Sequence, residues 1–202
     1  MWIKPAKAAA SIEFEPVISI GNNSPTWFLI SLSGGKLGFL YKRGQKPYRG
    51  EGEFYTSVSV DAKEWKENEW HHMALVWANV GRGKSVVRVY VDGTLKEARY
   101  NCTVGDGFDT PLLGIGFNTA STAGTRFSGE VDELRISNYP KTGKEIRECY
   151  ERVSRGEKMD GEEGTLLLLN FEGTTKGLSL TERGITEENL KSCVEAMLNE
   201  VE

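Results

Sequence analysis

The sequence predicts an all-β protein: an antiparallel two-sheet β-sandwich with a short helix before the last strand and an amphipathic helix at the C-terminus. Segments in which apolar and polar residues alternate recur along the chain, and a period of two is typical of a half-buried strand. Asp92-Gly93 joins two such segments with the residue types that a two-residue hairpin turn needs. We expect about ten strands, which is enough for two packed sheets.

The expected strands follow one another along most of the chain. Pro16 interrupts the first of them, which suggests a sheet edge or a bulge at that point. Residues 70–77 form the clearest strand, with Trp70 and His72 on one face and His71 on the other. In order, the expected strands are residues 11–20, 27–32, 36–42, 53–60, 70–77, 86–91, 94–99, 111–117, 126–137 and 165–171.

Two helices are expected. Residues 143–154 place apolar side chains at helical spacing, and Gly156 follows as a stop signal. Thr186 can cap a second helix with an apolar stripe along one face. A helix this short is marginal in water, so its stripe must pack on the sandwich or on another chain, and both interpretations remain open. The second predicts self-association through Leu190, Val194 and Leu198.

Length and charge limit the class of protein. We expect one domain over residues 1–175, followed by a linker and the amphipathic helix over residues 176–202. The net charge is -4 with both signs interspersed, which argues against nucleic acid and membranes as partners. No apolar run reaches the ~20 residues that a membrane-spanning helix requires. Cys102, Cys149 and Cys193 are expected to be reduced thiols, with one disulfide and a leftover thiol as the alternative.

Three segments in a fixed order point to a family. They are EWHHMALVW (Glu69–Trp77), VYVDGTLKE (Val89–Glu97) and RFSGEVDELRIS (Arg126–Ser137). Over residues 2–172 the chain resembles the laminin G-like, concanavalin A-like lectin/glucanase domains. The resemblance implies a jelly roll in which Trp70, His72, Asp92 and Gly93 are structural core positions.

The same resemblance implies recognition rather than catalysis. We expect a module that binds carbohydrate or a protein partner, in adhesion for example, as part of a larger extracellular or surface protein. Met1–Pro5 looks like the end of the family's first strand and lacks the apolar region of a signal peptide, so we expect the chain to be cut from a longer polypeptide. A structural subunit of a surface layer, filament or virion, with the C-terminal helix at subunit contacts, is the alternative.

A degenerate glycoside hydrolase is a further alternative. Laminarinase-type hydrolases of this fold use a Glu-x-Asp-x-Glu strand, because residues at i, i+2 and i+4 share one face. The matching positions are Glu130, Asp132 and Leu134, and leucine cannot protonate a leaving group. Glu133 and Arg135 are expected on the opposite face. We therefore expect that the protein is not an enzyme.

Metal and ligand sites can be suggested for a few positions. The resemblance implies Asp132 as a candidate calcium ligand, although calcium takes about six to eight oxygens; a hydrogen bond to backbone at a strand bend is the alternative. His71 and His72 face opposite sides and cannot hold one ion together. Tyr48 and Arg49, in a charged loop, and Trp65 are candidate ligand-binding residues, with Trp65 folding back on the sandwich edge as the alternative.

Overall fold

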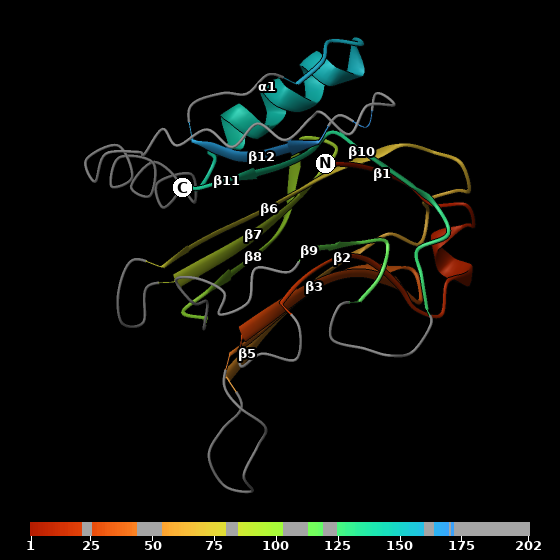
Figure 1. Ribbon diagram of the computed structural model, residues 1–202, viewed down its shortest axis with the longest axis horizontal. Helices are drawn as coiled ribbons and strands as arrows, with labels where there is room; N and C mark the ends of the chain where they lie inside the picture. Colours follow the sequence, from red (N-terminus) through yellow and green to blue (C-terminus); the bar gives the residue numbers. More distant parts are fainter. Residues whose placement is uncertain are drawn as a thin grey trace, which may run out of the picture.

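The computed structural model describes residues 1–21, 26–43, 54–79, 85–102, 113–118, 125–159, 164–169 and 171. These residues form antiparallel strands, a 3-10 turn and one α-helix (Figure 1). In chain order the elements are β1 (Trp2–Lys4), η1 (Ala9–Ser11), β2 (Glu15–Ile20), β3 (Thr26–Ser33), β4 (Lys36–Arg43), β5 (Phe54–Asp61), β6 (His71–Asn79), β7 (Ser85–Val91), β8 (Thr94–Tyr100), β9 (Leu113–Ile115), β10 (Glu130–Asp132), β11 (Leu134–Ser137), α1 (Gly143–Ser154) and β12 (Thr165–Leu169).

Two five-stranded sheets lie face to face, as the sequence predicts (Figure 1). One has the order β10-β1-β6-β7-β8 and the other the order β5-β4-β3-β2-β9, while β11 and β12 pair separately. The first sheet places β1 between β10 and β6, so Trp2 lies opposite His72 on one side and Asp132 on the other. The N-terminal strand thus joins segments that are far apart in the sequence.

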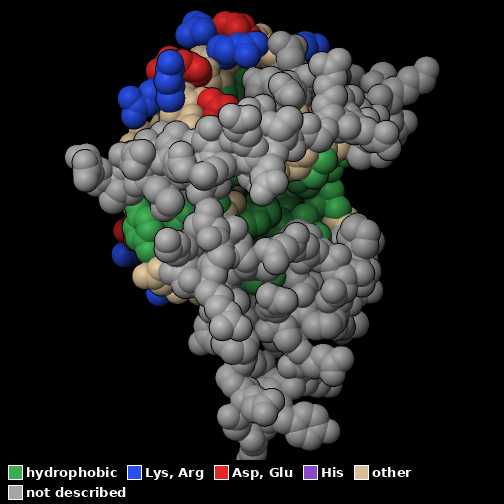
Figure 2. All heavy atoms as spheres, turned by 90° about the vertical axis from the view of Figure 1, so that its left-hand side faces the viewer, with side chains coloured by type: hydrophobic (Ala, Val, Ile, Leu, Met, Phe, Trp, Pro, Cys, Tyr) green, Lys and Arg blue, Asp and Glu red, His purple; other side chains and the backbone are tan. Residues whose placement is uncertain are grey.

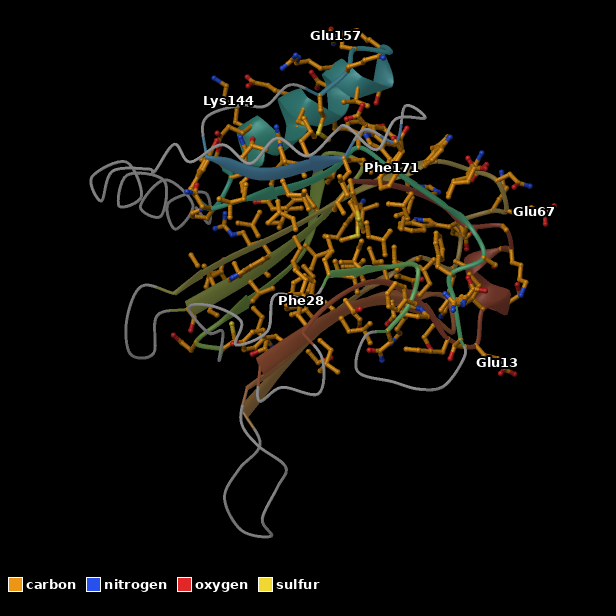
Figure 3. The ribbon with its side chains drawn as sticks, in the orientation of Figure 1. Glu13, Phe28, Glu67, Lys144, Glu157 and Phe171 are labelled. Carbon is orange, nitrogen blue, oxygen red and sulfur yellow. The ribbon has the colours of Figure 1, made fainter. Side chains whose placement is uncertain are left out.

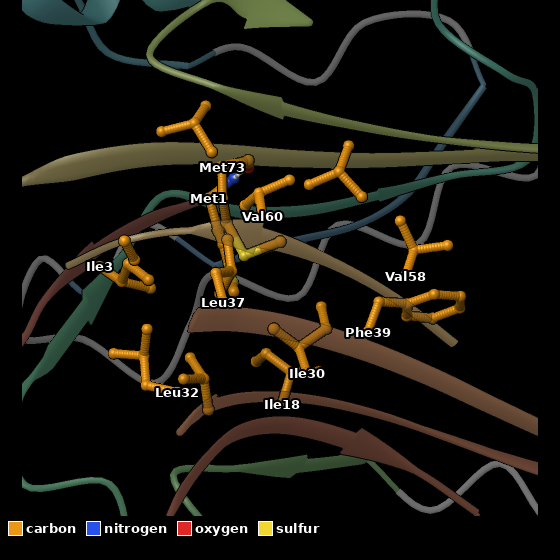
Figure 4. Packing of buried hydrophobic residues seen from close by; sticks show 14 of the residues in the cluster. Met1, Ile3, Ile18, Ile30, Leu32, Leu37, Phe39, Val58, Val60 and Met73 are labelled. Atoms are coloured by element: carbon orange, nitrogen blue, oxygen red, sulfur yellow. Dashed lines mark hydrogen bonds between the residues drawn. The ribbon is translucent and has the colours of Figure 1, made fainter. Parts of the chain in front are cut away.

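The main hydrophobic core fills the space between the two sheets. Successive side chains of each strand point to opposite faces of its sheet. The side chains that point inward from both sheets meet in this space, as Figure 4 shows for Ile3, Leu32, Leu37 and Met73. Phe28 points into the same space in Figure 3. Burying a side chain of this size contributes about 1.5–3 kcal/mol, so the facing sheets are held together mainly by this cluster.

A second cluster lies on the outer face of the β6–β7 pair. Val76, Val86 and Tyr90 pack there with Ile146 of α1. The pair is therefore buried on both faces, which explains why every residue of β7 is buried. The predicted alternation of residues 70–77 is confirmed, because Met73 belongs to the main core and Val76 to the cluster beneath α1.

Helix α1 has the bounds that the spacing predicts. Thr142 caps it: Oγ1 of Thr142 accepts the N–H of Glu145, and the Glu145 carboxylate accepts the N–H of Thr142. Gly156 has a left-handed φ of 83° just after the helix end. Charged side chains cover the outer side of α1 (Figure 2), and Lys144 and Glu157 point away from the body of the molecule (Figure 3).

One expectation about the strands is wrong, and of the two alternatives for Pro16 the bulge is the one observed. The single strand expected over residues 126–137 is wrong: β10 ends at Asp132, Glu133 takes a left-handed φ of 48°, and β11 pairs elsewhere. Such a φ breaks the extended geometry that one continuous strand requires. Pro16 does coincide with a shift of register in the β2–β3 pair, but β2 lies inside its sheet rather than at an edge.

Several sequence predictions fall on other parts of the chain. Tyr48, Arg49 and the C-terminal segment 176–202, with Leu190, Val194 and Leu198, lie outside the described residues. Within the described part, none of the helices has the length and apolar character needed to cross a membrane.

Candidate binding groove

Trp65 packs at one end of the main core, against the first residue of β6. The Trp65 side chain is 7% exposed and stacks on His71, with ring centroids 4.1 Å apart and planes 7° from parallel. This is the folded-back arrangement that the sequence left open for Trp65. His71 and His72 point to opposite faces, as expected, because His72 packs against Trp2 and Tyr150 on the α1 side.

Asp92 ties the hairpin turn to the start of β6. Its Oδ2 lies 3.0 Å from Nδ1 of His71, and its Oδ1 accepts the backbone N–H of His72 at 2.8 Å. Asp92 and Gly93 have φ values of 49° and 71°, the two left-handed conformations of a type I′ turn. A Cβ on Gly93 would lie 2.9 Å from Cδ1 of Tyr150, so glycine also permits α1 to approach the turn.

An open groove of about 390 Å³ lies where β1, the connection between β10 and β11, and α1 meet. Its aromatic residues are Trp2, Trp70 and Tyr150. Trp2 stacks on Tyr150, with centroids 5.6 Å apart and planes 20° from parallel. From α1, Val153 and Ser154 complete the described lining. One aromatic surface is thus built by β1, by the residue just before β6 and by α1, which are distant in sequence.

Trp70 corrects one prediction and defines the exposed end of the groove. It was expected in the structural core, but it precedes β6, lines the groove and is 40% exposed. The Nζ of Lys4 lies 5.0 Å from the centroid of its ring and 2.6 Å from Oε1 of Glu130. The indole therefore already faces one ammonium group from its own chain.

Two consecutive carboxylates, Asp132 and Glu133, also line the groove. The expectation that they point to opposite faces is wrong, because the left-handed φ of Glu133 interrupts the alternation of a strand. Oδ1 of Asp132 accepts the backbone N–H of Glu133 at 2.8 Å, which is the hydrogen bond at a strand bend that the sequence allowed for. The Glu133 side chain is largely buried.

Two basic groups beneath the groove, the His72 imidazole and the Met1 amine, are neutral near pH 7. Burial lowers the pKa of His72 well below its ordinary value of 6.5, and the N-terminal amine and Arg135 act in the same direction. Burial also lowers the pKa of the Met1 amine to about 5, and this amine donates to the carbonyl of Met73 at 3.1 Å. Nδ1 of His72 and Nε1 of Trp2 are buried without a hydrogen-bond partner among the described residues.

The described residues do not fit the calcium ion that the resemblance implies. Among them, no three His, Cys, Asp or Glu side chains come together as a metal would require. One oxygen of Asp132 is already used by a backbone N–H, whereas calcium takes about six to eight oxygens. The aspartate has a local structural partner instead.

At the three positions that match the motif, the carboxylate arrangement of a retaining hydrolase is not assembled either. Glu130 and Asp132 belong to β10, whereas Leu134 belongs to β11 and is 5% exposed in the main core. The position of the third carboxylate is thus both apolar and buried. A reacting sugar could not reach it.

Comparisons with known proteins show which family has this fold. Residues 1–147 match the family model Laminin_G_3, described as the concanavalin A-like lectin/glucanases superfamily. No curated protein matches the chain. A crystal structure of a mutant of HCR/D is similar, with a TM-score of 0.44 and 15% identity over 74% of this chain and 35% of that chain. Domains LG4-5 of the mouse laminin alpha1 chain give a TM-score of 0.37 and 16% identity, over 64% of this chain and 31% of that chain.

The protein thus spans about a third of the length of these two solved chains. The family match covers well over half of the sequence and includes all three segments that suggested the family, and the structure has the two facing antiparallel sheets expected of it. The chain therefore belongs to the laminin G-like branch of the concanavalin A-like lectin/glucanases superfamily.

Proposed function

We propose that this protein is a non-catalytic recognition module that binds a carbohydrate or a protein partner in the groove between Trp2, Trp70 and Tyr150. One observation supports this most directly: a large aromatic side chain, Trp70, is exposed at the rim of an open groove that also contains two carboxylates. Exposure of an indole ring to water is unfavourable, so covering it with a ligand is favourable. Ligand sites typically combine such apolar faces with a few polar groups.

The family supports the general role, because its members are known for binding and are commonly extracellular. An extracellular or surface location within a larger protein is accordingly part of the proposal. The proposed binding surface uses the left-handed turn at Glu133 and the C-terminal half of α1, with Tyr150, Val153 and Ser154.

A pair of arrays tests the proposal. The purified chain is applied to a glycan array and to an array of basic, neutral and acidic peptides, each with calcium and again with chelator. We expect at least one class of ligand to bind, and we expect Trp70→Ala to abolish that binding. Chelator should have little effect, because the described groove residues do not bring together three side chains that could hold calcium.

Phe14→Ala is the matched control. Phe14 is an aromatic residue of similar exposure, 37%, and it does not line the groove. It should leave binding unchanged. Blank arrays, or binding that survives Trp70→Ala, would contradict a recognition role for this groove.

A further inference from the structure

The charged groups that the groove presents to a ligand are acidic. Asp132 and Glu133 supply carboxylates, and the described lining contains no lysine, arginine or histidine. The hydroxyl of Ser154 already donates to the carbonyl of Tyr150 at 2.7 Å. The donors among the described lining side chains are neutral, namely the indole N–H groups of Trp2 and Trp70 and the Tyr150 hydroxyl, whereas the charged groups accept hydrogen bonds, which favours a ligand that donates through a positive charge.

The neighbouring cations have other partners. Lys4 is paired with Glu130, and an Nη of Arg135 donates to Sγ of Cys149 at 3.6 Å. The Met1 amine and His72 are neutral near pH 7 for the reasons given above. Oδ2 of Asp132 makes no hydrogen bond or ion pair with the described residues. The carboxylate of Asp132 can therefore attract a positive charge.

The aromatic side chains favour the same kind of ligand. A ring face attracts a cation, and the attraction increases when water is excluded. Lys4 shows this within the protein, because its ammonium lies over the ring of Trp70. An anionic glycan would meet two carboxylates instead, and like charges brought together in a groove repel.

From these contacts we infer that the groove binds a lysine or arginine side chain of a partner protein, with the cation between Trp70 and the carboxylate of Asp132. This inference rests on the proposed function and names its ligand. A groove of about 390 Å³ is large enough for one long side chain, and its open form admits the backbone that such a side chain extends from. The long alkyl stem would lie along the aromatic rings.

The test compares a charged probe with a neutral probe of the same shape. The full chain, labelled with ¹⁵N, is titrated with Nα-acetyl-arginine methylamide and separately with Nα-acetyl-citrulline methylamide, while the indole N–H signals of Trp2 and Trp70 are followed by NMR. We expect the arginine probe to bind about tenfold more tightly or better, because hydrogen bonds between charged groups are about twice as strong as neutral ones. Equal affinity for the two probes would overturn the inference.

Two variants locate the charge. Asp132→Asn keeps the oxygen that accepts the Glu133 N–H and removes the negative charge, so it should weaken arginine binding by about tenfold. Glu148→Gln removes the same charge from the outer side of α1, where Glu148 pairs with Lys144, and should change nothing. Unchanged binding in Asp132→Asn, with thermal unfolding like that of the parent, would also overturn the inference.

Two further probes separate this inference from the proposed function. If neutral methyl glycosides shift the Trp70 signal and the arginine probe does not, the groove is a saccharide site: the proposed function stands and the inference fails. If no probe shifts either indole signal, both fail. N-Butylguanidine carries the guanidinium and an alkyl stem with neither a peptide backbone nor a second charge, and tighter binding of this probe than of the arginine probe would point to a free small cation instead of a protein.

Discussion

Asp92 begins the turn that follows β7, and its Oδ2 lies 3.0 Å from Nδ1 of His71 at the start of the neighbouring strand β6. The same carboxylate accepts the backbone N–H of His72, so a single side chain fixes the first two residues of β6. His72 in turn packs on Trp2 and Tyr150. The hairpin turn is therefore connected through β6 to the aromatic side of the groove.

Replacing Asp92 with alanine should destabilise the fold. Asp92→Ala leaves the N–H of His72 and Nδ1 of His71 without this acceptor, which should cost about 1–3 kcal/mol, and alanine also tolerates the left-handed φ poorly. Asp92→Asn retains an acceptor and a residue type that accepts this φ, so its loss should be smaller. Urea unfolding measures both variants, and equal losses would show that the hydrogen bonds contribute little.

Alanine substitutions at Gly93 and Gly34 distinguish the stability cost of backbone strain from that of steric contact. Both glycines have left-handed φ values, 71° and 55°, but a Cβ would meet Tyr150 at Gly93 and nothing within 4 Å at Gly34. Gly34→Ala should cost about 1–2 kcal/mol from the φ alone. Gly93→Ala should cost clearly more and should also move the indole N–H signal of Trp2, which stacks on Tyr150. A similar cost at both positions would mean that α1 can shift away without penalty.

Local signals in the sequence identify much of the fold. The alternation of residues 70–77 predicts the two faces of β6, and Asp92-Gly93 predicts the turn, because each depends on residues that are close in sequence. The spacing of apolar residues gives α1 with its observed bounds. These are features that neighbouring residues determine without help from the rest of the chain.

The groove could not be predicted in this way. It joins Trp2, Asp132 and Tyr150, which strand pairing and helix packing bring together over more than a hundred residues. The break at Glu133 has no local signal, since glutamate rarely adopts a left-handed φ. Trp65 and Trp70 show the same limit: both lie in polar surroundings in the sequence, yet one is buried and the other exposed.

The cap of α1 should influence the groove, because this helix supplies Tyr150. Thr142→Ala removes the hydroxyl that accepts the N–H of Glu145 and should cost about 1 kcal/mol. Thr142→Ser keeps the hydroxyl and should cost little. Hydrogen exchange of the first turn of α1 should become faster in the alanine variant and remain near the parent rate in the serine variant. The same rate in all three proteins would show that tertiary packing alone holds the helix end.

Stability should fall as the solution becomes more acidic, because two buried bases have lowered pKa values. The pKa of the Met1 amine falls from 8.0 to about 5 on folding, so between these pH values the unfolded chain binds more protons than the folded one. The free energy of unfolding therefore rises with pH across this window, by an amount on the order of a few kcal/mol. His72 acts with the same sign below its ordinary pKa of 6.5.

The variant His72→Phe separates the two contributions. Phenylalanine keeps an aromatic ring between Trp2 and Tyr150 but does not titrate. The free energy of unfolding, measured with urea at a series of pH values, should fall less steeply below pH 6.5 in this variant than in the parent. More than about one pH unit above 6.5 the two proteins should have the same slope, because unfolded His72 is then also neutral and only the Met1 amine still changes its proton binding on unfolding. Parallel curves over the whole range would mean that His72 binds its proton equally well in the folded protein, and that its burial does not exclude the charged form.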